Sequence, residues 1–129
     1  MRFSGKCAVI TGAGAGIGRV YAQALAREGA AIVIADIDAA AGEDAAAEIA
    51  GQGGQAIATV TDVADDAQVE GMAAEAVRAF GGIDILVNNA ALHLLEYAAP
   101  CTQLERAKWR RLLDVNVTGA LACAAACRP

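Results

Sequence analysis

A glycine-rich segment at residues 11–18, TGAGAGIG, directly follows the apolar run at residues 7–10. An amphipathic stretch carrying Tyr21 and Leu25 comes next, so the glycines join a predicted strand to a predicted helix. Glycines in that position let the backbone turn tightly and approach a phosphate, which the free N–H groups of the helix N-terminus stabilise. The segment therefore favours a dinucleotide-binding α/β domain.

Strand-like and helix-like segments alternate along the whole chain. Apolar runs without polar alternation, typical of strands covered on both faces, lie at residues 7–10, 31–35, 56–60 and 83–87. The order βαβαβαβα predicts a Rossmann-like, doubly wound parallel sheet that is truncated after the fourth strand and the helices following it. With 129 residues and no repeat or linker, we expect one domain over residues 1–129.

The helices between the strands carry their own signals. Residues 39–50 are rich in alanine, and residues 69–80 place apolar side chains at spacings of three and four, with Asp65 and Gln68 as a cap and its partner. After the fourth strand, residues 102–105, TQLE, have the form of a capping box for a further helix. We expect a second helix from about residue 115 toward residue 127.

The composition excludes several classes of function. The net charge is −5 and the lysines are Lys6 and Lys108, which argues against nucleic-acid binding. The basic residues at positions 106–111 are interpreted as a solvated helix face. No apolar run reaches the length of a membrane span, and no signal peptide is evident, so we expect a cytoplasmic protein.

The cysteines and the histidine give no sign of a metal site. Four cysteines without a CxxC pair predict reduced thiols, and Cys123 and Cys127, four residues apart, are expected to be buried in packing. The single histidine, His93, has no partner ligand and is interpreted as a loop residue.

An acidic residue stands where a dinucleotide's ribose would need it. Asp36 ends the second predicted strand, 18 residues after Gly18. Its carboxylate would accept hydrogen bonds from the ribose hydroxyls and would repel a 2′-phosphate, which favours NAD over NADP. Arg19 lies inside the first helix and is not interpreted as a phosphate clamp. The alternative for Asp36 is a helix cap or turn residue.

The strict GxGxxG fingerprint is not met, because Ile17 stands where it requires a glycine. The loop reads TGxxxGxG instead, and in this it resembles the short-chain dehydrogenase/reductase family. Three further segments match the family in order and spacing: residues 62–63 (DV), residues 88–91 (NNAA, where the family usually has NNAG) and residues 114–119 (DVNVTG, for DxNxxG).

The resemblance implies a set of site residues. The implied cofactor-binding positions are Gly12, Ala15, Gly16, Ile17, Gly18, Asp36, Ile37, Asp62, Val63, Asn89, Ala90 and Ala91. In the family an Asp like Asp62 holds the adenine ring, although an ordinary turn Asp is the alternative here. Asn116 matches one member of the catalytic Asn, Ser, Tyr and Lys set and would interrupt helical hydrogen bonding to hold a water. A simple helix-start or kink residue is its alternative.

The other three catalytic residues of the family have no match. The tyrosines are Tyr21 and Tyr97, neither followed by a lysine four residues later, and the serine is Ser4, ahead of the first strand. We therefore expect the chain to be inactive alone. The fourth strand, central in the family, would become an exposed sheet edge, which favours a homo-oligomer that covers it.

Two hypotheses follow from these observations. The first is an NAD-dependent oxidoreductase acting on a small secondary alcohol or ketone, represented by its cofactor-binding half. The second is a catalytically inactive module that binds NAD(H) or self-associates.

Overall fold

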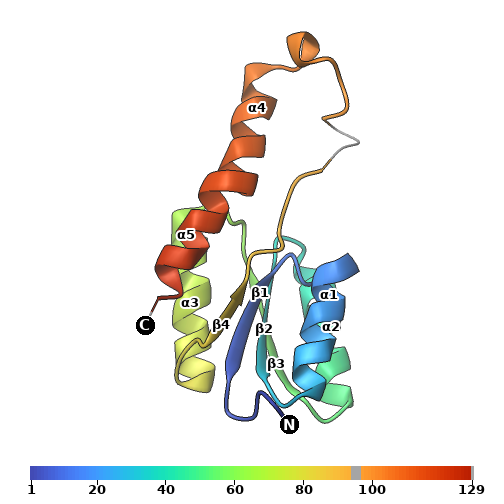
Figure 1. The fold of residues 1–129 in the computed structure, drawn as a ribbon, viewed down its shortest axis with the longest axis vertical. Coiled ribbons are helices and arrows are strands. Elements are labelled where there is room, and N and C mark those ends of the chain that lie inside the picture. Colours follow the sequence, from blue (N-terminus) through green and yellow to red (C-terminus); the bar gives the residue numbers. More distant parts are fainter. Residues whose placement is uncertain (94–96, 129) are drawn as a thin grey trace.

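A computed structural model describes residues 1–93 and 97–128 of the chain. Within those residues, four parallel strands form one sheet in the order β3-β2-β1-β4 (Figure 1). The strands are β1 (Cys7–Thr11), β2 (Ala31–Asp36), β3 (Gln55–Val60) and β4 (Ile85–Val87). Apolar runs bounded by turns thus form strands where the pattern predicts them, although β4 is shorter than predicted.

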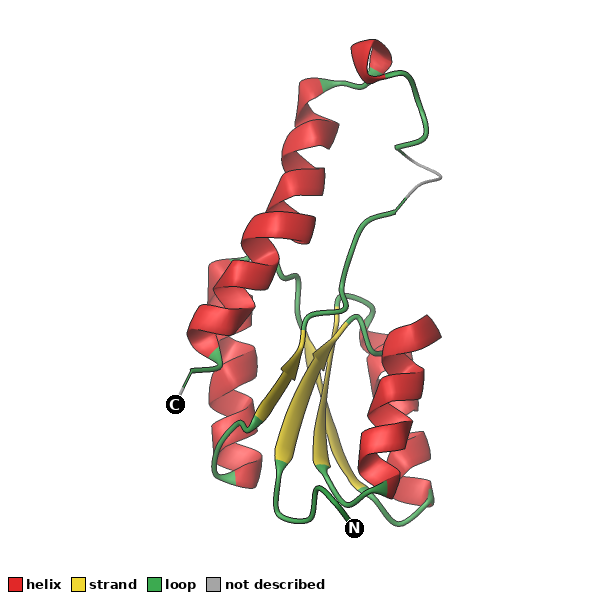
Figure 2. Ribbon diagram, in the orientation of Figure 1, coloured by secondary structure: helices red, strands yellow, loops and turns green. Residues whose placement is uncertain are grey.

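Helices cover both faces of the sheet (Figure 2). On one face lie α1 (Gly16–Arg27) and α2 (Ala39–Gly51), and on the other lie α3 (Asp66–Phe80) and α5 (Gly119–Ala126). This arrangement confirms the Rossmann-like, doubly wound fold.

Alternate residues of the strands supply two separate cores. Val9 and Val33 are buried in the core under α3 and α5, while Ile10, Ile32 and Ile34 are buried in the core under α1 and α2. Burying an aliphatic side chain of this size contributes about 1.5–3 kcal/mol relative to exposure. Because both faces are covered, the strands need no polar alternation.

The start of β4 is fastened to the start of β1 through Asp84. Its carboxylate accepts hydrogen bonds from Lys6 Nζ at 2.7 Å and from the Cys7 N–H at 2.9 Å. These two contacts lower the pKa of Asp84. Residues 83 and 84, predicted as strand, therefore form the approach to β4 rather than its first two residues.

A long helical arm extends beyond the sheet (Figure 1). It consists of α4 (Arg106–Leu113), a π-helical turn at Asp114–Thr118 and α5, joined without a break. The predicted restart of a second helix near residue 115 is thus wrong, because the wider π-turn carries the helix through that position. 

The capping box predicted at residues 102–105 is also wrong. Residues Cys101–Gln103 form a short 3-10 turn, and α4 begins at Arg106 with Glu105 as an N-cap residue that makes no side-chain capping bond. The capping residues of α3, in contrast, are confirmed. Asp65 Oδ1 accepts a hydrogen bond from the Gln68 N–H at 3.1 Å, while Gln68 Oε1 accepts one from the Asp62 N–H.

Three of the four cysteines are packed into the core under α3 and α5. Cys7, Cys123 and Cys127 are buried free thiols, whereas Cys101 is exposed. Burial raises the pKa of both Cys7 and Cys127 to about 11. The predicted packing role of Cys123 and Cys127 is therefore confirmed.

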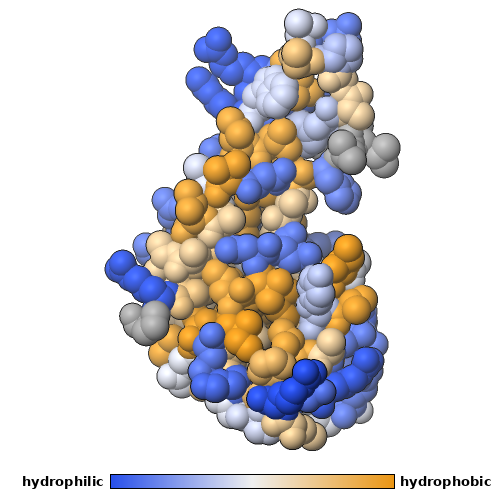
Figure 3. Space-filling view, viewed as in Figure 1, coloured by the Kyte–Doolittle hydropathy of each residue, from blue (hydrophilic) through white to orange (hydrophobic). Residues whose placement is uncertain are grey.

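Large apolar side chains remain exposed along the arm. Figure 3 shows hydrophobic residues running along it and over the neighbouring flank of the sheet. Leu113, Val117 and Leu121 are each at least half exposed, and Trp109 is 38% exposed. Their spacing of four residues places them along one side of the arm. 

Candidate functional site

The carboxyl ends of the strands enclose a cavity of about 200 Å³. Seven predicted cofactor-binding residues line it: Gly12, Asp36, Ile37, Asp62, Val63, Ala90 and Ala91. Thr61, Leu92, Arg111 and Val115 line it as well and were not predicted. A larger hollow of about 470 Å³ lies between α3 and α5, and it contains no predicted site residue. Ligand sites in open α/β sheets lie at the carboxyl ends of the strands, so the smaller cavity is the candidate site.

The glycine loop curves around one end of this cavity. Gly12 and Gly16 have φ values of +64° and +56°, a region that strongly favours glycine. A Cβ on Gly12 would lie 3.0 Å from Ala90 Cα, whereas a Cβ on Gly16 would meet no atom within 4 Å. Gly12 thus allows the loop to approach the segment after β4, and Gly16 leaves open space at the start of α1.

Gly18 serves a different purpose, the packing of α1 beneath the loop. A Cβ there would overlap the carbonyl oxygen of Gly12 and lie 2.5 Å from Asn89 Nδ2. The three glycines of the TGxxxGxG motif therefore have distinct roles: Gly12 allows close approach, Gly16 leaves open space and Gly18 allows helix packing.

Thr11 and Asn89 join the carboxyl ends of β1 and β4. Thr11 is 1% exposed, and its Oγ1 accepts hydrogen bonds from the N–H groups of Asn89 and Ala90, both at 3.0 Å. In return, Asn89 Nδ2 donates to the carbonyl oxygens of Thr11 and Gly12 at 3.0 and 3.1 Å. Asn89 thus fixes the first two carbonyl groups of the glycine loop. Thr11 was not predicted as a site residue, although it begins the glycine motif.

Asp36 is fixed by two main-chain groups. Its Oδ2 accepts a hydrogen bond from the Gly14 N–H at 2.8 Å, and its Oδ1 accepts one from the Asp38 N–H at 2.9 Å. The cap of α2 is Asp38, whose carboxylate accepts from the Ala41 N–H. Asp36 therefore makes a turn contact without capping the helix, and its carboxylate still lines the cavity.

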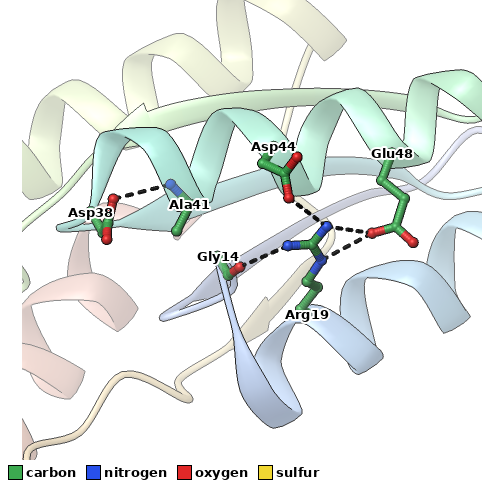
Figure 4. Close-up of polar contacts among 6 residues, drawn as sticks. All are labelled: Gly14, Arg19, Asp38, Ala41, Asp44 and Glu48. Atoms are coloured by element: carbon green, nitrogen blue, oxygen red, sulfur yellow. Dashed lines mark hydrogen bonds and ion pairs between the residues drawn. The ribbon is translucent and has the colours of Figure 1, made fainter.

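Arg19 is held away from the cavity by α2 (Figure 4). Its guanidinium donates to Glu48 Oε2 at 3.0 and 2.6 Å and to Asp44 Oδ2 at 2.8 Å. A further group, Nη1, donates to the Gly14 carbonyl oxygen at 3.4 Å. Hydrogen bonds to Glu48 and Asp44 raise the pKa of Arg19. Its charge is thus already paired with two carboxylates of α2.

Asp62 forms an ion pair with α4 across the cavity wall. Its Oδ2 lies 3.0 Å from Arg111 Nη2, and its Oδ1 accepts a hydrogen bond from the Ala64 N–H at 3.0 Å. Burial opposes ionisation of Asp62, but the Ala64 hydrogen bond and Arg111 outweigh it and lower the pKa of the carboxyl group. The interpretation of Arg111 as part of a solvated face is wrong for this reason.

Asn116 lies in the π-turn and faces the loop after β4. Its Oδ1 accepts from the Leu92 N–H at 2.8 Å, and its Nδ2 donates to the Leu92 carbonyl oxygen at 2.9 Å. The helix widens into a π-turn at this point and continues into α5. Asn116 does not line the cavity itself, but Leu92 and Val115 beside it do.

The remaining predicted residues lie in or near the glycine loop. Ala15 is the N-cap residue of α1 and makes no side-chain capping bond, so it leaves the helix N-terminus uncovered. Ile17, in the first turn of α1, is 66% exposed.

His93 is exposed in the loop after β4. Among the described residues, no group of three or more His, Cys, Asp or Glu side chains could hold a metal ion.

Comparison with known proteins identifies the family. The family model described as short chain dehydrogenase matches residues 6–129, nearly the whole chain. The chain belongs to the short-chain dehydrogenase/reductase family.

Its relatives in this family include polyol dehydrogenases. The chain is 47% identical to sorbitol dehydrogenase of Cereibacter sphaeroides over 121 residues, which cover 94% of this chain and 45% of that protein. It is 44% identical to galactitol 2-dehydrogenase of Agrobacterium fabrum over 119 residues, which cover 92% and 44%. The chain therefore spans about half the length of these two relatives.

Solved structures of short-chain dehydrogenases share the fold. A metagenomic short-chain oxidoreductase in complex with NADP matches with a TM-score of 0.90 and 30% identity, covering 98% of this chain and 56% of that one. A short chain dehydrogenase from Mycobacterium avium matches with a TM-score of 0.91 and 33% identity, covering 98% and 46%. 

The geometry of this short-chain dehydrogenase site fits a nicotinamide dinucleotide. A backbone cradle with open space at Gly16, an uncapped helix N-terminus and an acid at the end of β2 meet at one edge of the sheet. The N–H groups and the helix dipole suit a pyrophosphate, and the acid suits ribose hydroxyls.

Within residues 1–93 and 97–128, no helix is long and apolar enough to cross a membrane.

Proposed function

We propose that this chain is the cofactor-binding part of an NAD(H)-dependent oxidoreductase that interconverts a secondary alcohol and a ketone. Asp36 is the observation that carries the choice of NAD, because its carboxylate lines the cavity beside the glycine loop. A 2′-phosphate would bring negative charge toward this acid, and the nearby Arg19 is already paired with two carboxylates.

The interconversion of a secondary alcohol and a ketone is a hydride transfer. A dinucleotide bound at this site would supply hydride-transfer chemistry between the carbinol carbon of the alcohol and the nicotinamide ring, and the hydroxyl proton would pass to a base or to solvent. This chain's contribution is to bind the dinucleotide and orient it. The proton transfer, in a protein of the relatives' length, would fall to a Tyr-x-x-x-Lys pair of the kind found in the family, with a Ser that orients the carbonyl or hydroxyl.

The printed sequence contains no such pair. The residues four positions after Tyr21 and Tyr97 are Leu25 and Cys101, and Ser4 precedes β1. We therefore propose that the 129-residue chain binds NAD(H) without turning over substrate. Asn116 is the matched family residue of the catalytic set, and its tie to Leu92 fixes the π-turn beside the cavity.

The substrate class is the least constrained part of this proposal. Two relatives are named sorbitol dehydrogenase and galactitol 2-dehydrogenase, which supports polyols as the first secondary alcohols to assay. Ala91 lines the cavity in place of the family's usual glycine, and we propose that it narrows the space beside the cofactor ribose.

A fluorescence titration of the 129-residue chain with NADH and NADPH tests the proposal. We expect saturable binding of NADH, with NADPH bound at least about tenfold more weakly because of charge repulsion at Asp36. Equal affinity for the two dinucleotides would contradict the proposed preference for NAD(H) over NADP(H). Absence of binding to either would overturn the cofactor-binding function.

One observation favours the second hypothesis, a self-associating module. The exposed side chains of Trp109, Leu113, Val117 and Leu121 form an apolar stripe along the arm. Contiguous apolar surface of this kind is typical of protein interfaces. We propose that a second copy of the chain covers the stripe, so that NAD(H) binding and homo-oligomer formation belong to one molecule. Light scattering of the purified chain tests this by giving its mass in solution.

A further inference from the structure

Arg111 connects the helical arm to the loop after β3. Its Nη2 lies 3.0 Å from Asp62 Oδ2, and the two side chains are 39% and 23% exposed. Both residues line the candidate cofactor cavity. The contact joins residues 49 positions apart in the sequence. It therefore fixes the arm relative to the sheet, and it also fixes the orientation of the Asp62 carboxylate.

Asp62 is held at both of its oxygens. Oδ1 accepts a hydrogen bond from the Ala64 N–H at 3.0 Å, and Oδ2 faces Arg111. The main-chain N–H of Asp62 donates to Gln68 Oε1 at 2.8 Å. A carboxylate offers about four acceptor positions, so two contacts leave capacity for a ligand N–H group. The Asp62 side chain is thus oriented before any ligand arrives, which reduces the entropy lost on binding.

The charges around the cavity give Arg111 a second effect. Among the described residues that line it, Asp36 and Asp62 are the acids and Arg111 is the cation. A dinucleotide brings a negatively charged pyrophosphate into this space, so an unpaired second acid would oppose its binding. Arg111 offsets that charge while leaving the acceptor oxygens of Asp62 in place.

We propose that Arg111 is a positioning residue for the cofactor, holding Asp62 so that its carboxylate accepts a hydrogen bond from the 6-amino group of adenine. The proposal rests on the proposed NAD(H)-binding function and adds a residue to it. Arg111 acts through Asp62, and the arm that carries it is fixed on the same cavity by the contacts of Asn116 with Leu92.

Two dinucleotides that differ at the 6-amino group test the proposal. NADH carries that amino group. Reduced nicotinamide hypoxanthine dinucleotide carries a carbonyl oxygen instead, which has no hydrogen to donate to the Asp62 carboxylate. We expect the unmodified chain to bind NADH about tenfold more tightly than the hypoxanthine analogue, the value of one hydrogen bond to a charged group.

Variants of the ion pair then separate positioning from general stability. Arg111→Gln should lose most of the tenfold preference, and it should also weaken the hypoxanthine analogue by a smaller factor, because the charge of Asp62 is then unpaired near the pyrophosphate. Arg111→Lys should restore part of the preference, and Arg110→Gln, a change of the same charge at an exposed neighbour, should keep all of it. Asp62→Asn should lose the preference, and adding Arg111→Gln to it should cause little further loss, because both changes remove one interaction.

Each alternative outcome has a distinct meaning. If Arg111→Gln retains the full preference, or weakens both dinucleotides equally, Arg111 does not position Asp62 and the inference is overturned while NAD(H) binding stands. If the unmodified chain binds both dinucleotides equally, Asp62 does not contact the amino group and the inference is likewise overturned. If it binds neither, the proposed function itself fails. Urea unfolding midpoints of the variants confirm that each is folded during the titration.

Discussion

The main-chain N–H of Gly14 donates a hydrogen bond to Asp36 Oδ2 at 2.8 Å, so the end of β2 holds the middle of the glycine loop. The residue proposed to choose the cofactor therefore also shapes the loop that would hold its phosphates. A Cβ on Gly14 would lie 2.9 Å from the same oxygen, which explains why this loop position suits a glycine.

Replacing Asp36 by Asn tests the choice of cofactor. Asn can keep the acceptor for Gly14 but loses the one for the Asp38 N–H, and it removes the charge. We therefore expect NADH affinity to fall about tenfold and the discrimination against NADPH to shrink. Asp38→Asn is the matched control, because it removes a charge two residues away and keeps a good N-cap for α2. Fluorescence titrations of both variants measure the effect, and unchanged discrimination in Asp36→Asn would contradict our assignment.

Replacing Thr11 by Val tests the junction of β1 and β4. The change leaves the N–H groups of Asn89 and Ala90 without their acceptor, so we expect a loss of about 2–3 kcal/mol in the free energy of unfolding. Thr11→Ser, which keeps the hydroxyl, should lose less. Urea denaturation measures both, with Thr102→Val as an exposed control. A Val variant as stable as the Ser variant would show that the hydroxyl is dispensable.

Three glycine-to-alanine changes separate the roles of glycine in this chain. Gly18→Ala should destabilise the protein by about 1–3 kcal/mol, because its Cβ overlaps the Gly12 carbonyl oxygen. Gly16→Ala has space but requires a left-handed backbone, at a cost of roughly 1 kcal/mol. Gly71→Ala, in an open position inside α3, should stabilise by about 0.5–1 kcal/mol. Thermal unfolding ranks the three, and any other order would contradict these roles.

The stability of the chain should depend on Asp84 in acid. Hydrogen bonds from Lys6 and from the Cys7 N–H lower the pKa of Asp84 in the folded state. A lowered pKa means that the stabilisation is fully present above the ordinary value of 3.8 and is lost as the pH falls through the lower, folded value. Asp84→Asn should therefore be less stable than the unmodified chain at pH 7, and the difference should shrink toward pH 2. Urea midpoints across that range test this, and a difference independent of pH would contradict it.

Breaking the apolar stripe should reduce self-association. Leu121 is 68% exposed on α5, so Leu121→Arg should shift the chain toward a smaller species in light scattering without lowering its thermal stability as a monomer. Val77→Arg places the same charge at a half-exposed site on α3 and serves as the control. A chain that is monomeric before either change would contradict self-association through this stripe.

Local patterns predicted the strands and the glycine loop well, because both depend on neighbours in sequence. β1 and β2 are apolar up to their last residues, Thr11 and Asp36, as a sheet covered on both faces requires. The arm was predicted less well. The TQLE pattern at residues 102–105 has the form of a helix cap. The helix nevertheless begins only at Arg106, since capping patterns also occur in turns.

The contacts that complete the site depend on the fold. Arg111 was grouped with its basic neighbours because a sequence gives no sign that an acid 49 positions away will face one of them. Thr11 was likewise recognised as part of a motif, while its two hydrogen bonds across to the loop after β4 require strands distant in sequence to be adjacent. Asp36 was found because a strand end and a fixed interval define its position.

The π-turn at Asp114–Thr118 makes the arm sensitive to changes in length as well as in composition. Such a turn accommodates one residue more than an ordinary helical turn, and each residue rotates a helix by about 100°. Deleting one residue within this turn would therefore convert it into an ordinary helical turn and leave Arg111 facing Asp62. Inserting one residue beside it would instead turn α4 by that angle relative to the sheet, and Arg111 would point away from Asp62 even though neither residue had changed. The arm should therefore tolerate many substitutions, and one deletion at this turn, but few single-residue insertions.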